Sequence, residues 1–104
     1  MYQYNKGGNK VNYIMATQIF IKNIDVVEKK LGKETILYNI ETGKIHVLNL
    51  IATTIWALCD GKNSTEEIVR IISSKFKEKE EIVIADIYDA VNEFLKHQLI
   101  KKDV

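Results

Sequence analysis

The segment HVLNLIATTIWALCDGKNSTEEI, residues 46–68, contains a change from strand-like to helix-like spacing of its apolar residues. It begins inside Lys44–Leu48, a short apolar segment of strand composition. Asn49 follows, and its side-chain oxygen can accept a backbone N–H left free in the first turn of a helix. The apolar residues beyond it recur at helical spacing; they are Ile51, Ile55 and Leu58, with Trp56 next to that face. The segment therefore predicts a strand followed directly by a helix.

Two further helices are predicted downstream. Asp60-Gly61 ends the first helix, because glycine readily adopts the left-handed conformation past a helix C-terminus. Ser64 and Glu67 have the spacing of a capping box, which marks the start of the second helix. Its apolar face consists of Ile68, Ile71, Ile72 and Phe76. A charged connector, residues 77–81, leads to a third helix with no capping residue at its start. The apolar stripe of that helix consists of Ile84, Ile87, Val91 and Phe94.

Upstream, three short strands with tight connections are predicted. Residues 25–31 and 34–40 have strand composition, and Gly32-Lys33 between them suits a two-residue hairpin turn. Residues 41–43 form a second turn signal that contains a glycine, and Lys44–Leu48 is the third strand. Two tight connections imply an antiparallel meander. The sequence thus predicts an α+β fold in which a three-stranded antiparallel sheet is followed by a three-helix bundle, in the order β-β-β-α-α-α.

The chain has 104 residues, a length typical of one domain with one modest core. We assign residues 25–104 to this domain and residues 1–24 to an N-terminal extension. The first 18 residues of the extension contain Gly7-Gly8 and three asparagines, which favour a flexible arm. Ile19-Phe20-Ile21 within it has strand composition, so the alternative is an arm that adds an extra strand.

The composition restricts the partners and the compartment. Fifteen Lys and Arg against fourteen Asp and Glu give a net charge of +1, so no overall surplus for binding nucleic acid exists. No apolar run reaches the roughly 18 residues of a membrane span, and the N-terminus lacks a signal-peptide pattern. The single cysteine excludes an internal disulfide. We therefore expect a cytoplasmic protein with no nucleic-acid or membrane partner.

The residues that carry catalysis or metal binding are sparse. Cys59, His46 and His97 do not have the spacing of zinc ligands, and Cys59 next to Leu58 suits packing as a small hydrophobe. Asp86 and Asp89 are three apart on a helix, the pattern of a solvated edge. No convergent acid, base and nucleophile is present. The sequence indicates a protein that is not an enzyme, has no cofactor and acts through a surface.

Two surfaces are candidates. One is the outer edge of the strand Lys44–Leu48, which has no proline and one charge, and which can accept an extended peptide as an added strand. Alternatively, the N-terminal arm or a second copy of the chain covers that edge. The second surface is a helix-turn-helix formed by residues 49–59 and 64–76, as in DNA-binding proteins. Its second helix is nearly neutral, with Glu66, Glu67, Arg70 and Lys75, which makes DNA binding the weaker alternative.

The order of these features resembles the PqqD-like family, the RiPP recognition elements that serve ribosomally synthesised and post-translationally modified peptides (RiPPs). The resemblance covers about residues 25–101. The matching features are Leu48-Asn49, Ile55-Trp56, Asp60-Gly61, Thr65 to Ile68, and Leu99-Ile100. It implies a small winged-helix-like domain that binds the leader segment of a precursor peptide and presents it to a modifying enzyme. In this family the leader adds as a strand in the cleft between the third strand and the last helix.

The resemblance also implies the residues of the site. Backbone pairing would come from Lys44, Ile45, His46 and Val47, and the last helix would contribute Tyr88, Val91, Asn92, Leu95 and Lys96. Of these, Tyr88, Asn92 and Leu95 lie off the main apolar stripe and suit a cleft, while Lys96 can meet an acidic leader residue. The implied partners are the leader and a maturation enzyme, either a radical SAM enzyme or a lasso-type protease or cyclase. We expect a monomer or a weak homodimer.

One position departs from the family pattern. Gln98 stands where the family often has glycine before the final Leu-Ile. A residue other than glycine with positive φ costs about 1 kcal/mol or more, so the last helix either tolerates this cost or ends differently.

Overall fold

The three-stranded antiparallel sheet is built from β2 (Val26–Leu31), β3 (Glu34–Asn39) and β4 (Lys44–Leu48), in that order across the sheet. The structure, a computed structural model, describes residues 18–103. Gly32 and Gly43 in the two connections have φ values of 61° and 74°, a conformation that glycine adopts without steric cost. The predicted meander and both turns are confirmed.

The two faces of this sheet differ in burial. Thr35, Leu37 and Asn39 of β3 are fully buried, whereas Tyr38 is exposed. Directly opposite residues of neighbouring strands share a face, and Leu37 is opposite His46. Thus His46 lies on the inner face of β4. The outer face carries exposed apolar side chains that include Val27, Tyr38, Ile45 and Val47.

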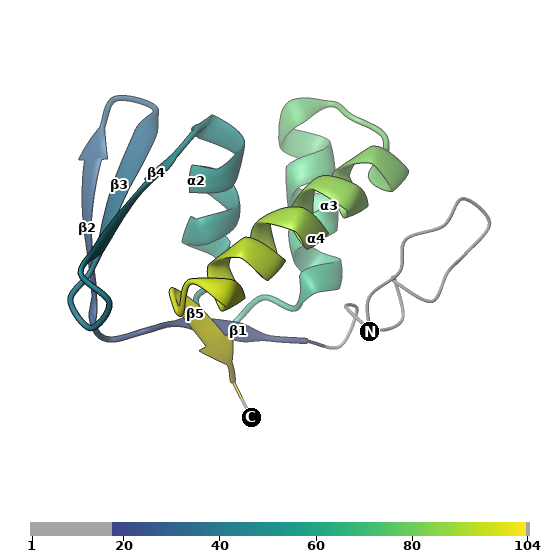
Figure 1. The fold of residues 1–104 in the computed structure, drawn as a ribbon. Helices are drawn as coiled ribbons and strands as arrows, with labels where there is room; N and C mark the ends of the chain where they lie inside the picture. The colour runs from purple at the N-terminus through teal and green to yellow at the C-terminus, as the bar shows by residue number, and fades with distance from the viewer. Residues whose placement is uncertain (1–17, 104) are drawn as a thin grey trace.

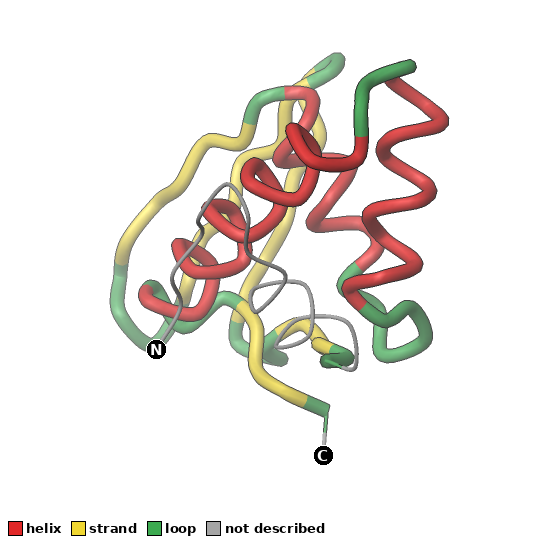
Figure 2. Tube along the Cα trace, turned by 90° about the vertical axis from the view of Figure 1, so that its right-hand side faces the viewer, coloured by secondary structure: helices red, strands yellow, loops and turns green. Residues whose placement is uncertain are grey.

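Three helices follow the sheet in the described part of the chain: α2 (Leu50–Leu58), α3 (Thr65–Phe76) and α4 (Glu80–Lys96). Helix α2 packs against β3 and β4, whereas α3 packs mainly against α4 and α2. All of them lie on one side of the sheet, and α4 crosses in front of its strands in the second view (Figure 1 and Figure 2). The prediction of a mixed α+β fold, with the sheet preceding three helices, is confirmed.

Local signals position α2. The Asn49 side chain accepts a hydrogen bond from the backbone N–H of Ala52 at 2.9 Å, as predicted. The face that α2 buries differs from the prediction, since Ile55 and Trp56 are buried while Ile51 is 37% exposed. The helix is rotated so that the larger indole, rather than Ile51, enters the core.

The ends of α3 and α4 follow their capping chemistry. Ser64 and Glu67 form the predicted capping box in both directions, with N···O distances of 3.2 and 2.7 Å. Ile68 and Ile72 are buried, but Ile71 is 39% exposed, so its assignment to the apolar face is wrong. The helix α4 begins at Glu80, inside the segment predicted as a connector, and Lys79 before it gives no side-chain cap.

The helix α4 ends in a Schellman motif. The backbone N–H groups of Gln98 and Leu99 donate to the carbonyl oxygens of Leu95 and Phe94, at 3.1 and 2.8 Å. Gln98 has a φ of 58°, the left-handed conformation that the family pattern reserves for glycine. The chain therefore keeps this helix end and tolerates the steric cost of a side chain there.

The N-terminal and C-terminal parts of the described chain pair with each other. Strand β1 (Phe20–Lys22) is antiparallel to β5 (Ile100–Lys102), and the two lie side by side in Figure 1. Phe20 is buried, and its carbonyl oxygen accepts from the N–H of Gly61 at 2.9 Å. The packed part of the chain thus begins before residue 25. Strand β5 is not predicted from the sequence, and residues 1–17 of the extension lie outside the described residues.

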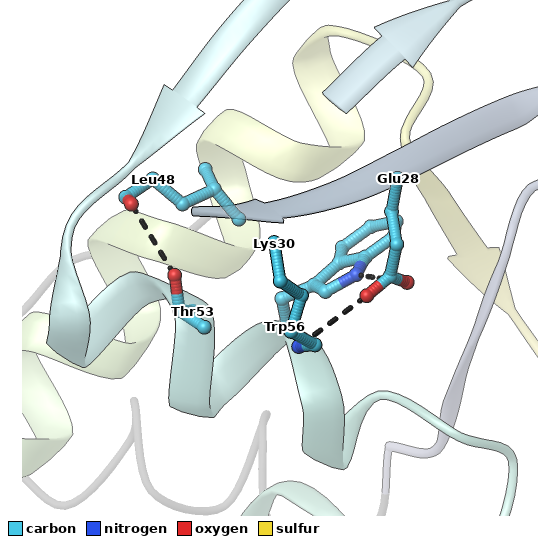
Figure 3. A network of polar contacts seen from close by, with 5 residues as sticks. All are labelled: Glu28, Lys30, Leu48, Thr53 and Trp56. Carbon is cyan, nitrogen blue, oxygen red and sulfur yellow. Dashed lines mark hydrogen bonds and ion pairs between the residues drawn. The ribbon is translucent and has the colours of Figure 1, made fainter. Parts of the chain in front are cut away.

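Trp56 lies at the centre of the core. Its ring packs edge-on against Phe94, with ring centroids 5.7 Å apart, and its Nε1–H donates to Glu28 at 3.1 Å (Figure 3). Partial burial would raise the pKa of Glu28, but the hydrogen bond from Trp56 and the contact with Lys30 outweigh it and lower that pKa. Cys59 is fully buried, and burial raises the pKa of its thiol to about 12, as suits a packing residue.

Candidate functional site

An open groove of about 550 Å³ lies between β4 and α4. Its lining comes from four parts of the fold: Ile45, His46, Val47 and Leu48 of β4, Ala52 of α2, Asp89, Ala90, Glu93, Phe94 of α4, and His97 and Leu99 after it. The buried side chains of Leu48, Phe94 and Leu99 give it an apolar base.

Small side chains keep this groove open. Ala52 and Ala90 line it on the two helices, and both also line a second hollow of about 260 Å³. The second hollow is bounded in addition by Asn49, Ile51 and Asp86. Because the two share these alanines, they lie next to each other between α2 and α4.

The strand β4 forms the other wall and has a free edge. It pairs with β3 on one side, and no other described strand pairs with it. Strand β1 pairs with β5, so residues 18–24 of the arm do not cover this edge. Ile45 and Val47 are 65% and 62% exposed. Both the backbone groups and these side chains are therefore accessible next to the groove.

Two histidines face each other in the groove wall. The ring centroids of His46 and His97 are 4.7 Å apart, and the Nε2 atom of His97 is 3.3 Å from a carboxylate oxygen of Glu93. His46 Nε2 is buried and has no hydrogen-bond partner among the described residues. Burial, followed by the positive charges of His97 and Lys44, lowers the pKa of His46, while Glu93 opposes the shift. The shift favours the neutral form of the ring.

Asn39 joins the two walls at this end of the groove. Its buried Nδ2 group donates to the carbonyl oxygens of His97 and Gln98, at 3.2 and 3.1 Å. Its Oδ1 atom accepts from the N–H groups of Glu41 and Thr42, at 2.9 and 3.2 Å. The turn between β3 and β4 is thus held against the end of α4. This role of Asn39 is not predictable from its sequence neighbours, which mark it only as a strand position.

The connection from β4 to α2 is also held by hydrogen bonds. The hydroxyl of Thr53 donates to the carbonyl oxygen of Leu48 at 3.2 Å (Figure 3), and Asn49 caps the helix directly after the strand. The strand that borders the groove is therefore held at both of its ends.

The structure brings together only part of the predicted site. Ile45, His46 and Val47 line the groove, and Lys44 is exposed at the start of the same strand. The predicted α4 residues do not line it: Tyr88 and Val91 are buried, Leu95 is half-buried, and Asn92 and Lys96 are exposed. The lining is instead formed by Asp89, Ala90, Glu93 and His97.

This difference has a geometric reason. Successive residues of an α-helix are about 100° apart, so the stripe through Val91 has two flanks. Tyr88, Leu95 and Asn92 lie on one flank, whereas Ala90, His97 and Glu93 lie on the other. The prediction selected the flank with the larger apolar side chains, but the groove is on the flank with alanine and histidine.

Other kinds of site are not seen in residues 18–103. No group of three or more His, Cys, Asp or Glu in that range is arranged to hold a metal ion. None of the described helices is long and apolar enough to cross a membrane. On α3, the helix that would face DNA in a helix-turn-helix, Arg70 lies 3.9 Å from Glu66, so this helix does not present an unopposed basic surface.

Comparison with known proteins identifies relatives at the family and fold levels. Residues 34–100 match the protein family described as coenzyme PQQ synthesis protein D (PqqD). Among solved structures, the fold is similar to that of TbiB1 in complex with the TbiA(beta) leader peptide, with a TM-score of 0.73 and 23% sequence identity. The similarity covers 81% of this chain and 98% of the TbiB1 chain. No curated protein sequence matches this chain.

Proposed function

Since the chain belongs to the PqqD family, we propose that it is a RiPP recognition element that binds the leader segment of a ribosomally synthesised precursor peptide. The leader adds to the free edge of β4 as an extended strand, and alternate side chains enter the groove between β4 and α4. The protein then presents the bound peptide to a modifying enzyme, as a non-catalytic adaptor without a cofactor of its own.

The observation that carries this proposal is a strand edge with which no described strand pairs, beside a groove with an apolar base. In an antiparallel pair, alternate residues direct both backbone groups to the same side, so a five-residue edge offers roughly four to six hydrogen bonds. Each is worth about 1 kcal/mol net, and ordering a flexible peptide costs several kcal/mol. Side chains anchored in the groove must therefore supply much of the affinity and the specificity.

The fold similarity supports the same proposal. TbiB1 binds the TbiA(beta) leader peptide in a fold that this chain shares over most of its length. At 23% identity this is an argument from the fold, and the site of this chain is argued from its own groove. The proposed site consists of the β4 edge, including Lys44, with Ala90 and Glu93 on α4 and His97 directly after that helix.

The geometry of strand addition leaves half of the peptide accessible to an enzyme. Side chains of a strand alternate between the two faces of a sheet. One set of leader side chains would face α4, and the other would lie beside Ile45 and Val47 on the outer face. A maturation enzyme, either a radical SAM enzyme or a lasso-type protease or cyclase, would act on the segment that follows the leader. The adaptor is proposed to work as a monomer or a weak homodimer in the cytoplasm.

The competing proposal is a winged-helix DNA-binding regulator. The near-neutral charge of the chain and the Glu66–Arg70 pair on α3 argue against it. Duplex DNA that binds with a steep salt dependence would support this alternative, because phosphate contacts release counterions.

The experiment is an amide NMR titration with the leader of the precursor peptide encoded nearest to this gene. We expect shifts in residues 44–48 and at Asp89, Ala90 and Glu93, and slower amide hydrogen exchange along β4 in the complex. Exchange reports strand addition because each new backbone bond protects an amide hydrogen.

Two matched variants test the location. Ala90→Phe fills the groove, since Ala90 lines both hollows, and it should abolish the shifts. Asn92→Phe adds the same ring to the exposed opposite flank of α4 and should leave binding unchanged. Equal binding by both variants would place the peptide elsewhere on the protein and would contradict the proposal.

A further inference from the structure

The polar rim of the groove is acidic. Asp89 and Glu93 line the larger hollow and Asp86 lines the smaller one, whereas no lysine or arginine among residues 18–103 lines either. Lys44 lies at the start of β4 and influences His46 electrostatically, but it is not part of the lining. The chain as a whole has a net charge of +1, so this face of α4 departs from the overall balance.

These carboxylates are not neutralised by basic side chains of the described chain. Asp86 and Asp89 have no ion pair or hydrogen bond to another side chain among the described residues. Glu93 contacts the ring of His97 at 3.3 Å, a pair that is ionic only when the histidine is protonated. All three are exposed, so a bound peptide can reach them.

We propose that the groove selects leader peptides with lysine or arginine at the positions that face α4. This inference rests on the proposed function and adds the chemical class of the peptide to it. A cationic side chain that lies over the apolar base of the groove can place its aliphatic part on Phe94 or Leu48 and its charged end at the acidic rim. An acidic peptide would meet like charges along the same rim.

The spacing of the acidic residues fits an extended peptide. Asp89 and Glu93 are four residues apart on α4, which corresponds to about 6 Å along the helix axis. Alternate side chains of a strand are about 6.6 Å apart. If the peptide strand runs alongside α4, two basic residues separated by one other residue can therefore reach both carboxylates.

This inference reverses the charge expected from the sequence. The family resemblance of the sequence suggests that Lys96 meets an acidic leader residue. Lys96 is exposed on the flank of α4 that does not line the groove. The residues that do line it on α4 are acidic, so the complementary peptide is basic.

The test is a selection from a random peptide library by mRNA display, with the full chain immobilised. Selection on the wild type is compared with selection on the variant that carries Asp86→Asn, Asp89→Asn and Glu93→Gln. The matched control carries Glu34→Gln, Glu41→Gln and Glu66→Gln, which remove three exposed carboxylates outside the groove and change the net charge equally. Selected peptides are then titrated against all three proteins at low and at high salt.

We expect the wild type and the control to enrich peptides with lysine or arginine, preferentially two residues apart. These peptides should bind the groove variant roughly tenfold more weakly, because each exposed pair contributes a factor of about two to five. The difference should shrink at 1 M salt, where charges are screened within about 3 Å.

The two proposals fail in different ways. In one outcome, the enriched peptides compete with one another and do not bind the Ala90→Phe variant, but show no preference for lysine or arginine. This outcome would overturn the charge inference and leave the peptide-binding function standing. Equal loss of binding in the groove variant and the control would also overturn it, because overall charge would then be the cause. No enrichment on any of the proteins would overturn both proposals.

Discussion

Replacing Asn39 by alanine tests whether the two walls of the groove are held together by one side chain. Asn39 is fully buried and makes four hydrogen bonds to backbone atoms, two at the turn before β4 and two at the end of α4. Each bond is worth about 0.5–1.5 kcal/mol net. Since Glu41, Thr42 and Gln98 are exposed, water can replace part of the loss. We therefore expect the lower part of the range, about 2–4 kcal/mol.

Urea denaturation followed by the fluorescence of Trp56 measures this loss directly, because the chain has one tryptophan and it is buried. For a domain of this size, about 3 kcal/mol corresponds to a decrease in Tm of roughly 12–24 °C. The variant should also bind the peptide more weakly at temperatures where it stays folded, because His97 loses the contact that fixes its backbone.

Two further variants separate the bonds from the packing. Asn39→Asp keeps the acceptor for the turn but places a carboxylate against the carbonyl oxygens of His97 and Gln98, so it should be at least as destabilising as alanine. Asn92→Ala removes an exposed asparagine on α4 and should change stability by less than about 0.5 kcal/mol. A loss below about 0.5 kcal/mol for Asn39→Ala would refute the bracing argument.

Four other substitutions have defined outcomes. Gly61→Ala should lower the free energy of unfolding by about 2–4 kcal/mol, because Gly61 has a φ of 80° and an added Cβ would lie 2.8 Å from Ile21 Cγ2. Gly43→Ala, with a φ of 74° and open space, should cost only about 1 kcal/mol in the same urea titration. Gln98→Gly should raise stability by up to about 1 kcal/mol, since it removes the side chain from a φ of 58°; a lower Tm would contradict this. The pKa of His46 is lowered in the folded protein, so the unfolded chain takes up the proton more readily as the pH falls below about 6.5, and stability should decrease there. His46→Gln should flatten this decrease between about pH 7 and pH 5.5, and an unchanged slope would contradict the assignment to His46.

Sequence reasoning succeeded where the cause of a structure is local. The Asn49 cap, the Ser64–Glu67 capping box and the glycine turn before β4 each depend on contacts within a few residues. Such signals predict the order of the strands and helices. They also predict β4, whose single charge and lack of proline leave its edge suited to accept another strand.

The pairing of the chain ends illustrates what local signals miss. Strand β5 has three residues, two of them lysines, and its partner Phe20–Lys22 lies about eighty residues earlier in the chain. No propensity identifies so short a strand. It forms because Phe20 and Ile100 are both buried in the core, which places the two segments side by side. Strand β1 overlaps Ile19-Phe20-Ile21, the segment for which the sequence predicts an extra strand as the alternative to a flexible arm.

The position of the groove on α4 could not be read from the apolar stripe, because a helix has two flanks beside its buried face. Large side chains such as Tyr88 and Leu95 fill the space around them, and Tyr88 is buried accordingly. A groove persists where facing residues are too small to fill it, as Ala52 and Ala90 are. The relevant signal was thus a pair of alanines on two helices that the sequence separates by 38 residues. Their positions beside the same groove depend on how α2 and α4 pack, and that packing also determines which charges of α4 a bound peptide meets.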